Sequence, residues 1–400
     1  MNGKGRSDGS KRGLVPRYRK GGYSRESVDQ RRKWLQEKTA ASLEHVGRFS
    51  FDPRQLRGNL ENPIGAAQVP LGVAGPLQVR GEHAQGTFYV PLATSEGALV
   101  RSFERGSVAL TRAGGVEARV VADANLVSPS FFFDSVEAAA SLGGWVEEHF
   151  QDIRRQAEST TSHGRLLDIR CRVFGRQVIA AFRYHTGDAQ GMNMIVRATD
   201  KACRWMSSRC GCTGFHIFSG QCSEKRASGF LLAEGKGKWA TASATLPEKI
   251  IQTYLGTSSQ GLYDVWHATV LGHLSAHAVG YSGHLANGLC ALFIATGQDV
   301  ANVANACAGI TDFRLCDEGL LVSVTLPALE IATVGGGTDL PTQRECLQLL
   351  GCHGSGHSKR LAEIAAATAL AGEISMGAAI ASGEFAAAHD HYGRNRPDPE

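Results

Sequence analysis

The sequence predicts an α+β fold, in which strands and helices form separate groups instead of one regular alternation. Three short runs, at 119–122, 166–173 and 177–184, have the apolar and β-branched content of strands. Two longer stretches, at 192–206 and 358–390, repeat apolar residues at helical spacing. The glycine-rich segments match neither the GxGxxG nor the GxxxxGK(S/T) spacing, so they do not indicate a Rossmann or P-loop nucleotide site.

The first 60 residues predict a basic tail followed by a helical unit. Residues 1–24 carry seven lysines and arginines against the single acid Asp8, without apolar periodicity. Such a composition is typical of a solvated, disordered segment, which we favour over a nucleic-acid-binding arm. Residues 25–60 place Val28, Trp34 and Leu35 among charged residues, as in an amphipathic helix.

The segments that follow continue the mixture of elements. Residues 61–95 are rich in proline and glycine and include the alternating run 87–92, which predicts loops and short strands. Helical spacing follows at 97–110 and again at 134–157. Beyond residue 229 strands and helices alternate, and we expect the apolar C-terminal helix to cross the core.

The composition predicts a cytoplasmic globular protein. A chain of 400 residues with 42% hydrophobic content is large enough for two or three structural units. The longest apolar runs are shorter than the roughly 18 to 20 residues of a membrane span, and the basic start lacks the apolar core of a secretory signal. The ten scattered cysteines fit reduced thiols better than a disulfide framework. We therefore expect no membrane and no nucleic-acid partner.

One small group of residues resembles a metal site. Cys352, His353 and His357 lie close in sequence, and the two histidines are spaced to share a helix face. Structural metal sites usually need a second well-spaced pair of ligands, which the sequence does not provide. The sequence therefore predicts no metal.

Four ionisable side chains each have a chemical and a structural interpretation. Glu96 starts a helical pattern, so it is either a catalytic acid or a first-turn carboxylate that complements the helix dipole. Lys225, in the polar loop around 219–228, either reaches into a site or is solvated like its neighbours. Asp299 either serves a site or caps the next helix. His389 ends the C-terminal helix, where the dipole alone would favour it.

A glycine-bearing turn suggests a nucleotide contact. Residues 187–194 read GDAQGMNM and open the helix predicted at 192–206. The first N–H groups of such a helix are suited to a pyrophosphate or a ribose. The alternative is an ordinary helix start whose methionines face the core.

Six short segments follow one another along the chain: Glu61-Asn-Pro-Ile-Gly65, Pro91-Leu-Ala-Thr-Ser-Glu-Gly97, Asp188-Ala-Gln-Gly-Met-Asn-Met194, Thr296-Gly-Gln-Asp299, Val334-Gly-Gly-Gly-Thr338 and the segment around His389. In wording and order they resemble the soluble catalytic part of the 3-hydroxy-3-methylglutaryl-CoA (HMG-CoA) reductases, in the form also found in eukaryotes. The resemblance runs from about residue 58 to 396.

The resemblance implies a domain arrangement and an assembly. A large CoA- and substrate-binding domain with a long central helix would comprise 61–120 and 228–400. A small, ferredoxin-like, non-Rossmann NADP-binding domain at 121–217 would be inserted in it, and the loop 218–227 would connect the two. The resemblance further implies a homo-oligomer, a dimer or a dimer of dimers, in which Glu96 and Asp299 reach Lys225 from the partner chain.

The implied activity is the NADPH-dependent reduction of HMG-CoA to mevalonate and CoA in two hydride steps. Lys225 would stabilise the oxyanion that forms on the thioester carbonyl. His389 would protonate the departing CoA thiolate from a C-terminal flap. Glu96, as a buried acid beside Asp299, would protonate the final alkoxide, while Asp299 would orient Lys225 and Glu96.

The same resemblance assigns binding roles. The residues that would bind the substrate are Glu61, Asn62, Ser102, Arg105, Arg119, Ser219, Arg226, His284 and Asn287, with Arg105 at the CoA phosphates. Those that would bind the NADPH cofactor are Asp188, Ala189, Gly191, Met192, Asn193, Gly335, Gly336 and Gly337.

Two positions depart from the family pattern. Counting back from His284 and Asn287, His267 stands where the family commonly has a lysine that helps bind the substrate carboxylate. Arg226 stands where a second lysine is frequent, and the two cations are not equivalent at a geometric site. These departures leave open a reductase of a different acyl-CoA thioester, and beside it a catalytically silent homologue. The presence of all four chemical positions argues against the silent homologue.

Overall fold

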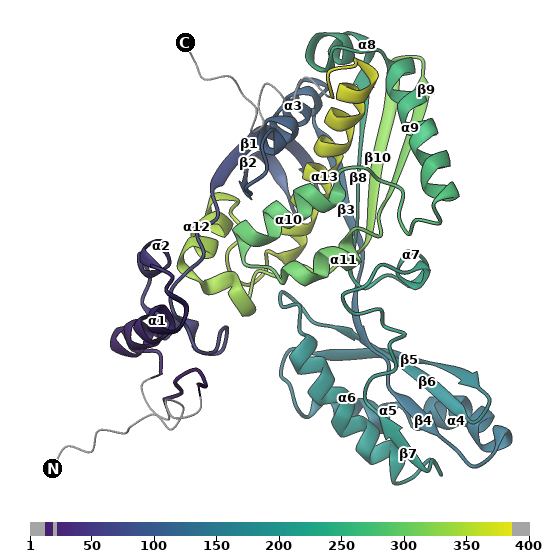
Figure 1. Cartoon of the computed structure of the whole chain (residues 1–400). Helices are drawn as coiled ribbons and strands as arrows, with labels where there is room; N and C mark the ends of the chain where they lie inside the picture. Colours follow the sequence, from purple (N-terminus) through teal and green to yellow (C-terminus); the bar gives the residue numbers. More distant parts are fainter. Residues whose placement is uncertain (1–12, 19–21, 386–400) are drawn as a thin grey trace.

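The computed structural model describes residues 13–18 and 22–385, and two large hydrophobic cores divide it into a large and a small lobe (Figure 1). The chain begins with helices α1 (Arg25–Thr39) and α2 (Glu44–Gly47) and the 3-10 helix η1 (Pro53–Leu56). The buried guanidinium of Arg31 donates to the carbonyl of Pro63 at 3.0 Å, which ties α1 to the segment leading into the large lobe. Residues 1–12 and 19–21 of the predicted basic tail lie outside the described residues.

The large lobe is built on a sheet with strand order β2-β1-β3-β8-β10-β9. Its strands are β1 (Leu71–Gly81), β2 (Gln85–Ala93), β3 (Val116–Val127), β8 (Gly237–Pro247), β9 (Ile310–Cys316) and β10 (Gly319–Leu329). β1 and β3 are parallel, and the other neighbours are antiparallel. Every second residue of β8 is buried, as expected for a strand with one face covered by helices.

The helix α13 (Ser358–Ala381) lies at the centre of the large lobe, where it contacts β3, β8 and β10. It is surrounded by α3 (Leu99–Arg112), α9 (Ser259–Ser275) and α10 (Leu285–Thr296). The other helices of this lobe are α7 (Gly229–Glu234), α8 (Glu248–Ile250), η2 (Ile251–Leu255), η3 (Val300–Asn302), α11 (Val303–Ala306), η4 (Gly336–Asp339) and α12 (Pro341–Leu349).

The apolar composition of α13 follows from its burial. Among the described residues it is the one helix that is long and apolar enough, by length and composition, to cross a membrane. No apolar run of that length was expected from the sequence. Within its most apolar window, however, 78% of the residues are buried inside the protein. Gly106 of α3 allows the closest approach to this helix, because a Cβ there would lie 1.9 Å from the carbonyl oxygen of Ala371.

The small lobe is an antiparallel sheet with strand order β7-β4-β6-β5. It comprises β4 (Ser130–Phe132), α4 (Val136–Glu148), α5 (Phe150–Glu158), β5 (Arg165–Phe174), β6 (Gln177–His185), α6 (Met192–Ser207) and β7 (Gly214–His216). Phe131, Phe182 and Ile195 belong to the core between this sheet and its helices. The end of β3 pairs with β6, so one long strand runs from the large sheet into the small lobe (Figure 1).

Most of the predicted elements are confirmed, with shifts at their ends. The helix predicted at 192–206 is α6, and the pattern at 134–157 consists of two helices that meet at His149. The helix predicted at 97–110 begins only at Leu99, after Ala98 in a left-handed conformation. Glu96 therefore precedes α3, and its interpretation as a first-turn carboxylate is wrong.

Candidate active site

A cavity of about 800 Å³ opens where the loop after β7 meets both lobes. It is lined by the turn at the start of α6, the loop that bears Lys225, the segment from Gly297 to Val300, and the glycine-rich stretch before and within η4. Predicted site residues on its wall are Ala189, Gly191, Met192, Asn193, Lys225, Asp299, Gly335, Gly336 and Gly337. Tertiary structure thus brings four distant segments of the sequence to one cavity.

Lys225 and Asp299 form an ion pair at this wall. Lys225 Nζ lies 2.8 Å from Asp299 Oδ2, and both side chains are partly exposed (45% and 37%). The hydrogen bond that Lys225 donates to Asp299 raises the pKa of Lys225 despite partial burial, so the ammonium stays charged at neutral pH. Asp299 also caps η3 by accepting a hydrogen bond from the N–H of Ala301, which confirms its structural interpretation; its chemical role stays a prediction.

This pair forms within one chain. In the described chain Asp299 is thus already paired with Lys225, whereas the resemblance implies that it reaches Lys225 from a partner chain. The short connection from α10 through Gly297 places Asp299 beside the loop of the same chain. A Cβ on Gly297 would lie 2.3 Å from the carbonyl oxygen of Gly337, so the backbone of this turn is packed against the glycine-rich stretch.

The loop that bears Lys225 is held from both lobes. Ser219 Oγ donates to the carbonyl of Ser128 at 2.6 Å, which anchors the start of the loop to the small lobe. The side chain of Asn305, fully buried on α11, accepts from the N–H of Lys225 at 2.7 Å and donates to the carbonyl of Ser223 at 2.9 Å. Ser223 and Lys225 both have positive φ angles, 49° and 57°, a conformation that non-glycine residues keep only when their surroundings hold it.

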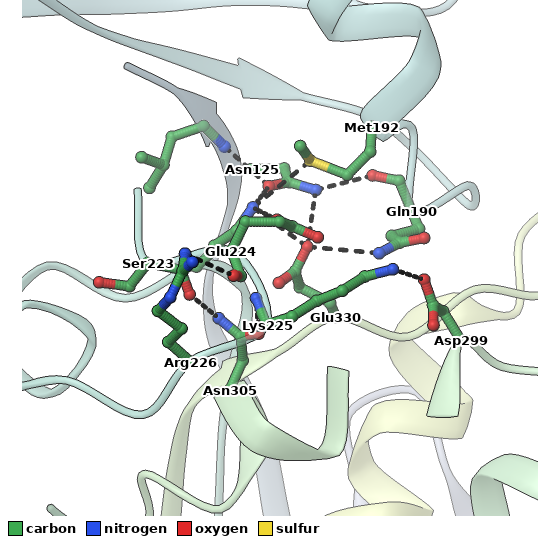
Figure 2. Close-up of polar contacts among 12 residues, drawn as sticks. Asn125, Gln190, Met192, Ser223, Glu224, Lys225, Arg226, Asp299, Asn305 and Glu330 are labelled. Carbon is green, nitrogen blue, oxygen red and sulfur yellow. Dashed lines mark hydrogen bonds and ion pairs between the residues drawn. The ribbon is translucent and has the colours of Figure 1, made fainter. Parts of the chain in front are cut away.

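Beneath the loop lies a buried polar network that the sequence did not predict (Figure 2). Lys236, with a fully buried side chain, places Nζ 2.6 Å from Asn125 Oδ1, 2.8 Å from Glu224 Oε2 and 3.2 Å from Glu330 Oε2. The ammonium group therefore hydrogen-bonds Asn125 and forms ion pairs with two carboxylates. Burial opposes the charge of Lys236, but Glu330 and Glu224 hold its pKa above the ordinary value. Burial raises the pKa of Glu330, and Lys236 counteracts part of that effect.

The turn before α6 offers free backbone donors to the cavity. Gly191 occupies the N-cap with a φ of 80°, and α6 has no side-chain cap. The carboxylate of Asp188 points elsewhere, because it accepts from the N–H groups of Gly356 and Ser358 at 2.8 and 3.1 Å. Although burial opposes it, these hydrogen bonds lower the pKa of Asp188. Asp188 therefore connects the turn to the start of α13.

Glu96, His284 and Asn287 form a second group. Asn287 Nδ2 lies 3.5 Å from Glu96 Oε1 and 3.3 Å from His284 Nδ1. His284 stacks on Phe103 with ring centroids 4.9 Å apart, and burial lowers its pKa to about 4. Glu96 is exposed, contrary to the expectation of a buried acid. Within the described residues its hydrogen-bond partners are Asn287 and Thr94, not Lys225 or Asp299.

The other predicted substrate residues are dispersed. Arg119 donates to the carbonyl of Arg80 at the rim of a separate hollow of about 490 Å³. Ser102 and Arg105 hydrogen-bond Ser375 of α13, and Arg105 also pairs with Glu384. Glu61 and Asn62 are absent from the cavity wall, which their neighbours Gly58 and Asn59 reach instead. Arg226 is exposed beside Lys225.

Two histidines need separate mention. His389 lies outside the described residues. His267 lies exposed on α9, and its ring stacks on that of Tyr263 at a centroid distance of 6.1 Å.

The described residues contain no group of three or more histidine, cysteine or acidic side chains arranged to hold a metal ion. Cys352 is buried, and His353 pairs with Asp339 at 3.0 Å.

Sequence reasoning missed Lys236, Glu330 and Asn305. One signal was present for Lys236. Lys236 and Lys238 are separated only by Gly237 and stand at the start of an otherwise apolar strand pattern. Because lysine is almost never fully buried without a partner, buried lysines there require acidic neighbours. The identity of those neighbours depends on pairing between distant segments.

Comparison with known proteins agrees with this geometry. The family model for hydroxymethylglutaryl-coenzyme A reductase matches residues 27–394. The HMG-CoA reductase of Methanocaldococcus jannaschii is 41% identical over 93% of this chain and 94% of its own length. That of Methanothermobacter thermautotrophicus is 42% identical over 92% and 94%.

A solved structure shares the fold. The class II HMG-CoA reductase of Streptococcus pneumoniae, in a structure bound to NADPH, aligns with a TM-score of 0.68 and 19% identity. The alignment covers 90% of this chain and 99% of that one. The family model and the archaeal relatives cover nearly the whole chain at high similarity. The chain therefore belongs to the hydroxymethylglutaryl-coenzyme A reductase family.

Proposed function

We propose that the protein reduces HMG-CoA to mevalonate and CoA, with NADPH as the hydride donor in two successive steps. The archaeal relatives carry the name of this enzyme, and the Streptococcus pneumoniae structure has NADPH bound. The observation that carries the proposal is the convergence on one cavity of the Lys225–Asp299 pair, the turn before α6 and the glycine-rich stretch 335–337.

In this proposal the two lobes bind different ligands. Residues 61–120 and 228–400 form the domain that binds acyl-CoA, 121–217 form an inserted NADP-binding domain, and 218–227 connect them. The strand order β7-β4-β6-β5, with antiparallel neighbours and with α4, α5 and α6 between the strands in sequence, supports a ferredoxin-like small domain. A Rossmann domain would have a parallel sheet instead.

The residues at the cavity fit a dinucleotide. The uncapped start of α6 presents backbone N–H groups of Met192 and Asn193, which suit a phosphate. Around Gly335 and Gly336 a Cβ would meet nothing within 4 Å, so the backbone there is accessible to a ligand. NADPH, when bound, would supply the hydrides, and the chain's own task is to orient it and to place charge and protons.

Lys225 supplies the charge. Reduction of the thioester carbonyl places negative charge on its oxygen, and an ammonium group fixed in the cavity stabilises that charge. Asp299 holds Nζ at 2.8 Å and so restricts the lysine to one orientation. Because the side chain of Lys225 is 45% exposed, a ligand in the cavity has access to it.

Protons come from two further residues in this proposal. Glu96 does not contact Lys225 or Asp299 in its own chain, so we assign the acid of each site to the partner's Glu96, which makes a dimer the smallest active unit. His389, in the segment beyond the described residues, is assigned the protonation of the CoA thiolate.

The ten unpaired cysteines support a cytoplasmic location as part of the same proposal.

The test is a turnover assay. Purified protein is mixed with NADPH and HMG-CoA, and we expect two NADPH oxidised and one mevalonate and one free CoA thiol formed for each thioester consumed. Oxidation of NADPH without mevalonate, or no oxidation at all, would contradict the proposal.

A second candidate is a reductase of a different acyl-CoA. The exposed His267 stands where the family commonly has the lysine that helps bind the substrate carboxylate, and an imidazole differs from an ammonium in size and reach. A panel of acyl-CoA thioesters with and without a terminal carboxylate distinguishes the two. Higher kcat/KM for a thioester that lacks the carboxylate would favour this second candidate.

A further inference from the structure

We propose that Lys236 is a positioning residue, which ties the loop bearing Lys225 to the cofactor turn and thereby sets the orientation of the Lys225–Asp299 pair. This inference rests on the proposed function. Neither Lys236 nor Asn125 lies on the cavity wall, so they act through the residues that do.

The contacts of Lys236 join four segments. Glu224 belongs to the loop, Glu330 follows β10, Asn125 lies on β3 and Met192 in the first turn of α6; Figure 2 labels these four residues. The sulfur of Met192 lies 3.4 Å from Lys236 Nζ. Asn125 in turn donates to the carbonyl of Gln190 at 2.8 Å and to Glu330 Oε2 at 3.2 Å. All four segments therefore contact the ammonium group of Lys236.

The loop needs such a tether because of its backbone. Ser223 and Lys225 both have left-handed φ angles, and only Glu224 separates them. The buried amide of Asn305 holds the main chain of these two residues from one side. The side chain of Glu224 is held from the other side by Lys236 at 2.8 Å. The direction in which the Lys225 side chain leaves the loop follows from both contacts together.

The stability of the fold alone does not explain why this polar network is buried. Burying one ammonium between two carboxylates costs desolvation free energy, and well-packed apolar side chains often give equal or greater stability. The alternative to positioning is that Lys236 only neutralises the buried Glu330. The two explanations differ in their prediction once Glu330 carries no charge.

The test compares Glu330→Gln with the double variant Lys236→Met/Glu330→Gln. The two proteins differ only at position 236, where the double variant lacks the ammonium group, and in both the buried Glu330 charge is absent. We expect the double variant to have a kcat about 100-fold lower than Glu330→Gln, because small displacements of a reacting group have effects of this size. We expect thermal melting to show both proteins folded at the assay temperature.

Hydrogen exchange gives a readout that does not depend on activity. The amides of Lys225 and Arg226 donate within the structure, to Asn305 and to the carbonyl of Ser223. In the double variant we expect exchange in residues 218–228 at least about tenfold faster than in Glu330→Gln, with exchange in β8 and α13 unchanged. Unchanged exchange in the loop would overturn the proposal about Lys236. Failure of the wild-type protein to reduce HMG-CoA would count against the proposed function alone, and the exchange measurement could still be made.

A conservative variant completes the design. Lys236→Arg keeps the charge, and a guanidinium can donate to Glu224 and Glu330 together, so we expect turnover within about tenfold of wild type. If the double variant does not fold, Lys236→Arg is compared with wild type instead, in turnover and in exchange of the loop. A double variant with kcat within about threefold of Glu330→Gln, or a Lys236→Arg protein as impaired as the double variant, would overturn the proposal.

Discussion

Under the proposed function, the charge of Lys225 stabilises the oxyanion, and turnover should depend on this single side chain. Lys225→Ala removes the cation from the cavity, and we expect kcat to fall by about 10²- to 10³-fold, the usual cost of losing one group that stabilises an oxyanion. Folding should change little, because the side chain is 45% exposed. Steady-state NADPH oxidation and a thermal melt measure the two effects.

The matched control is Lys201→Ala. Lys201 is an exposed lysine on α6 that donates to Ser159, away from the cavity wall. It changes the net charge equally and should leave kcat within about twofold of wild type. A Lys225→Ala protein as active as this control would show that the oxyanion is stabilised by another group.

His284 makes folding stability depend on pH. Burial lowers the pKa of His284 to about 4, below its ordinary value of 6.5. Between these values the unfolded chain takes up a proton that the folded protein does not. The free energy of unfolding should therefore fall as the pH is lowered from 6.5 to 4, by roughly 3 kcal/mol from this residue. Above pH 6.5 this contribution should be constant.

Urea unfolding of wild type and His284→Gln at pH 7 and pH 4.5 measures this effect. The variant cannot take up the proton, so its free energy of unfolding should decline less between the two pH values. Equal declines in the two proteins would mean that His284 is not buried in its neutral form.

The contact between α3 and α13 determines how the helices of the large lobe pack. A Cβ on Gly106 would lie 1.9 Å from the carbonyl oxygen of Ala371, so Gly106→Ala forces the two helices apart. We expect the free energy of unfolding to decrease by about 1 to 3 kcal/mol, as for other overpacked cores. Denaturant unfolding measures the change.

Gly143→Ala on α4 is the comparison. A Cβ there would meet nothing within 4 Å, and alanine is favoured over glycine in a helix by about 0.5 to 1 kcal/mol. This variant should be slightly more stable than wild type. If both substitutions had the same effect, the close approach of α3 and α13 would not control the packing.

Secondary structure was predicted well where one pattern extended over many residues. The periodic apolar residues of α6 and α13 and the strand-like run of β6 determine local structure, because each side chain needs only to face one core. The start of α3 was missed, since Ala98 adopts a left-handed conformation that no local signal announces. The same holds for the loop at 219–228, whose conformation is held by Asn305 from a distant segment.

At the scale of the whole molecule, the proposed function combined with the position of Glu96 requires a site shared between two chains. Under the proposed function each site contains Lys225 and Asp299 of one chain and the partner's Glu96. Mixtures of Glu96→Gln and Lys225→Ala proteins, dissociated and reassociated together, should therefore regain about a quarter of wild-type activity, because half of the random dimers carry one intact site in two.

The control for this experiment is a mixture of Lys225→Ala and Asp299→Asn proteins. Both residues of the ion pair belong to one chain, so a mixed dimer has no site with both intact, and activity should not return. Recovery in this control mixture, or none in the first one, would contradict the proposed arrangement.

The sequence by itself determined the mixture of helix and strand and the family, and it singled out Lys225 and Asp299, which the structure brings together as an ion pair. These depend on local patterns and on short motifs that can be recognised one at a time. Only the tertiary structure decided that Asp299 meets Lys225 within the same chain, that Asp188 connects the turn to α13, and that Lys236 is buried against Glu224 and Glu330. Ion pairs between distant segments depend on chain packing, because their energy is a function of distance in space and of burial rather than of separation along the sequence.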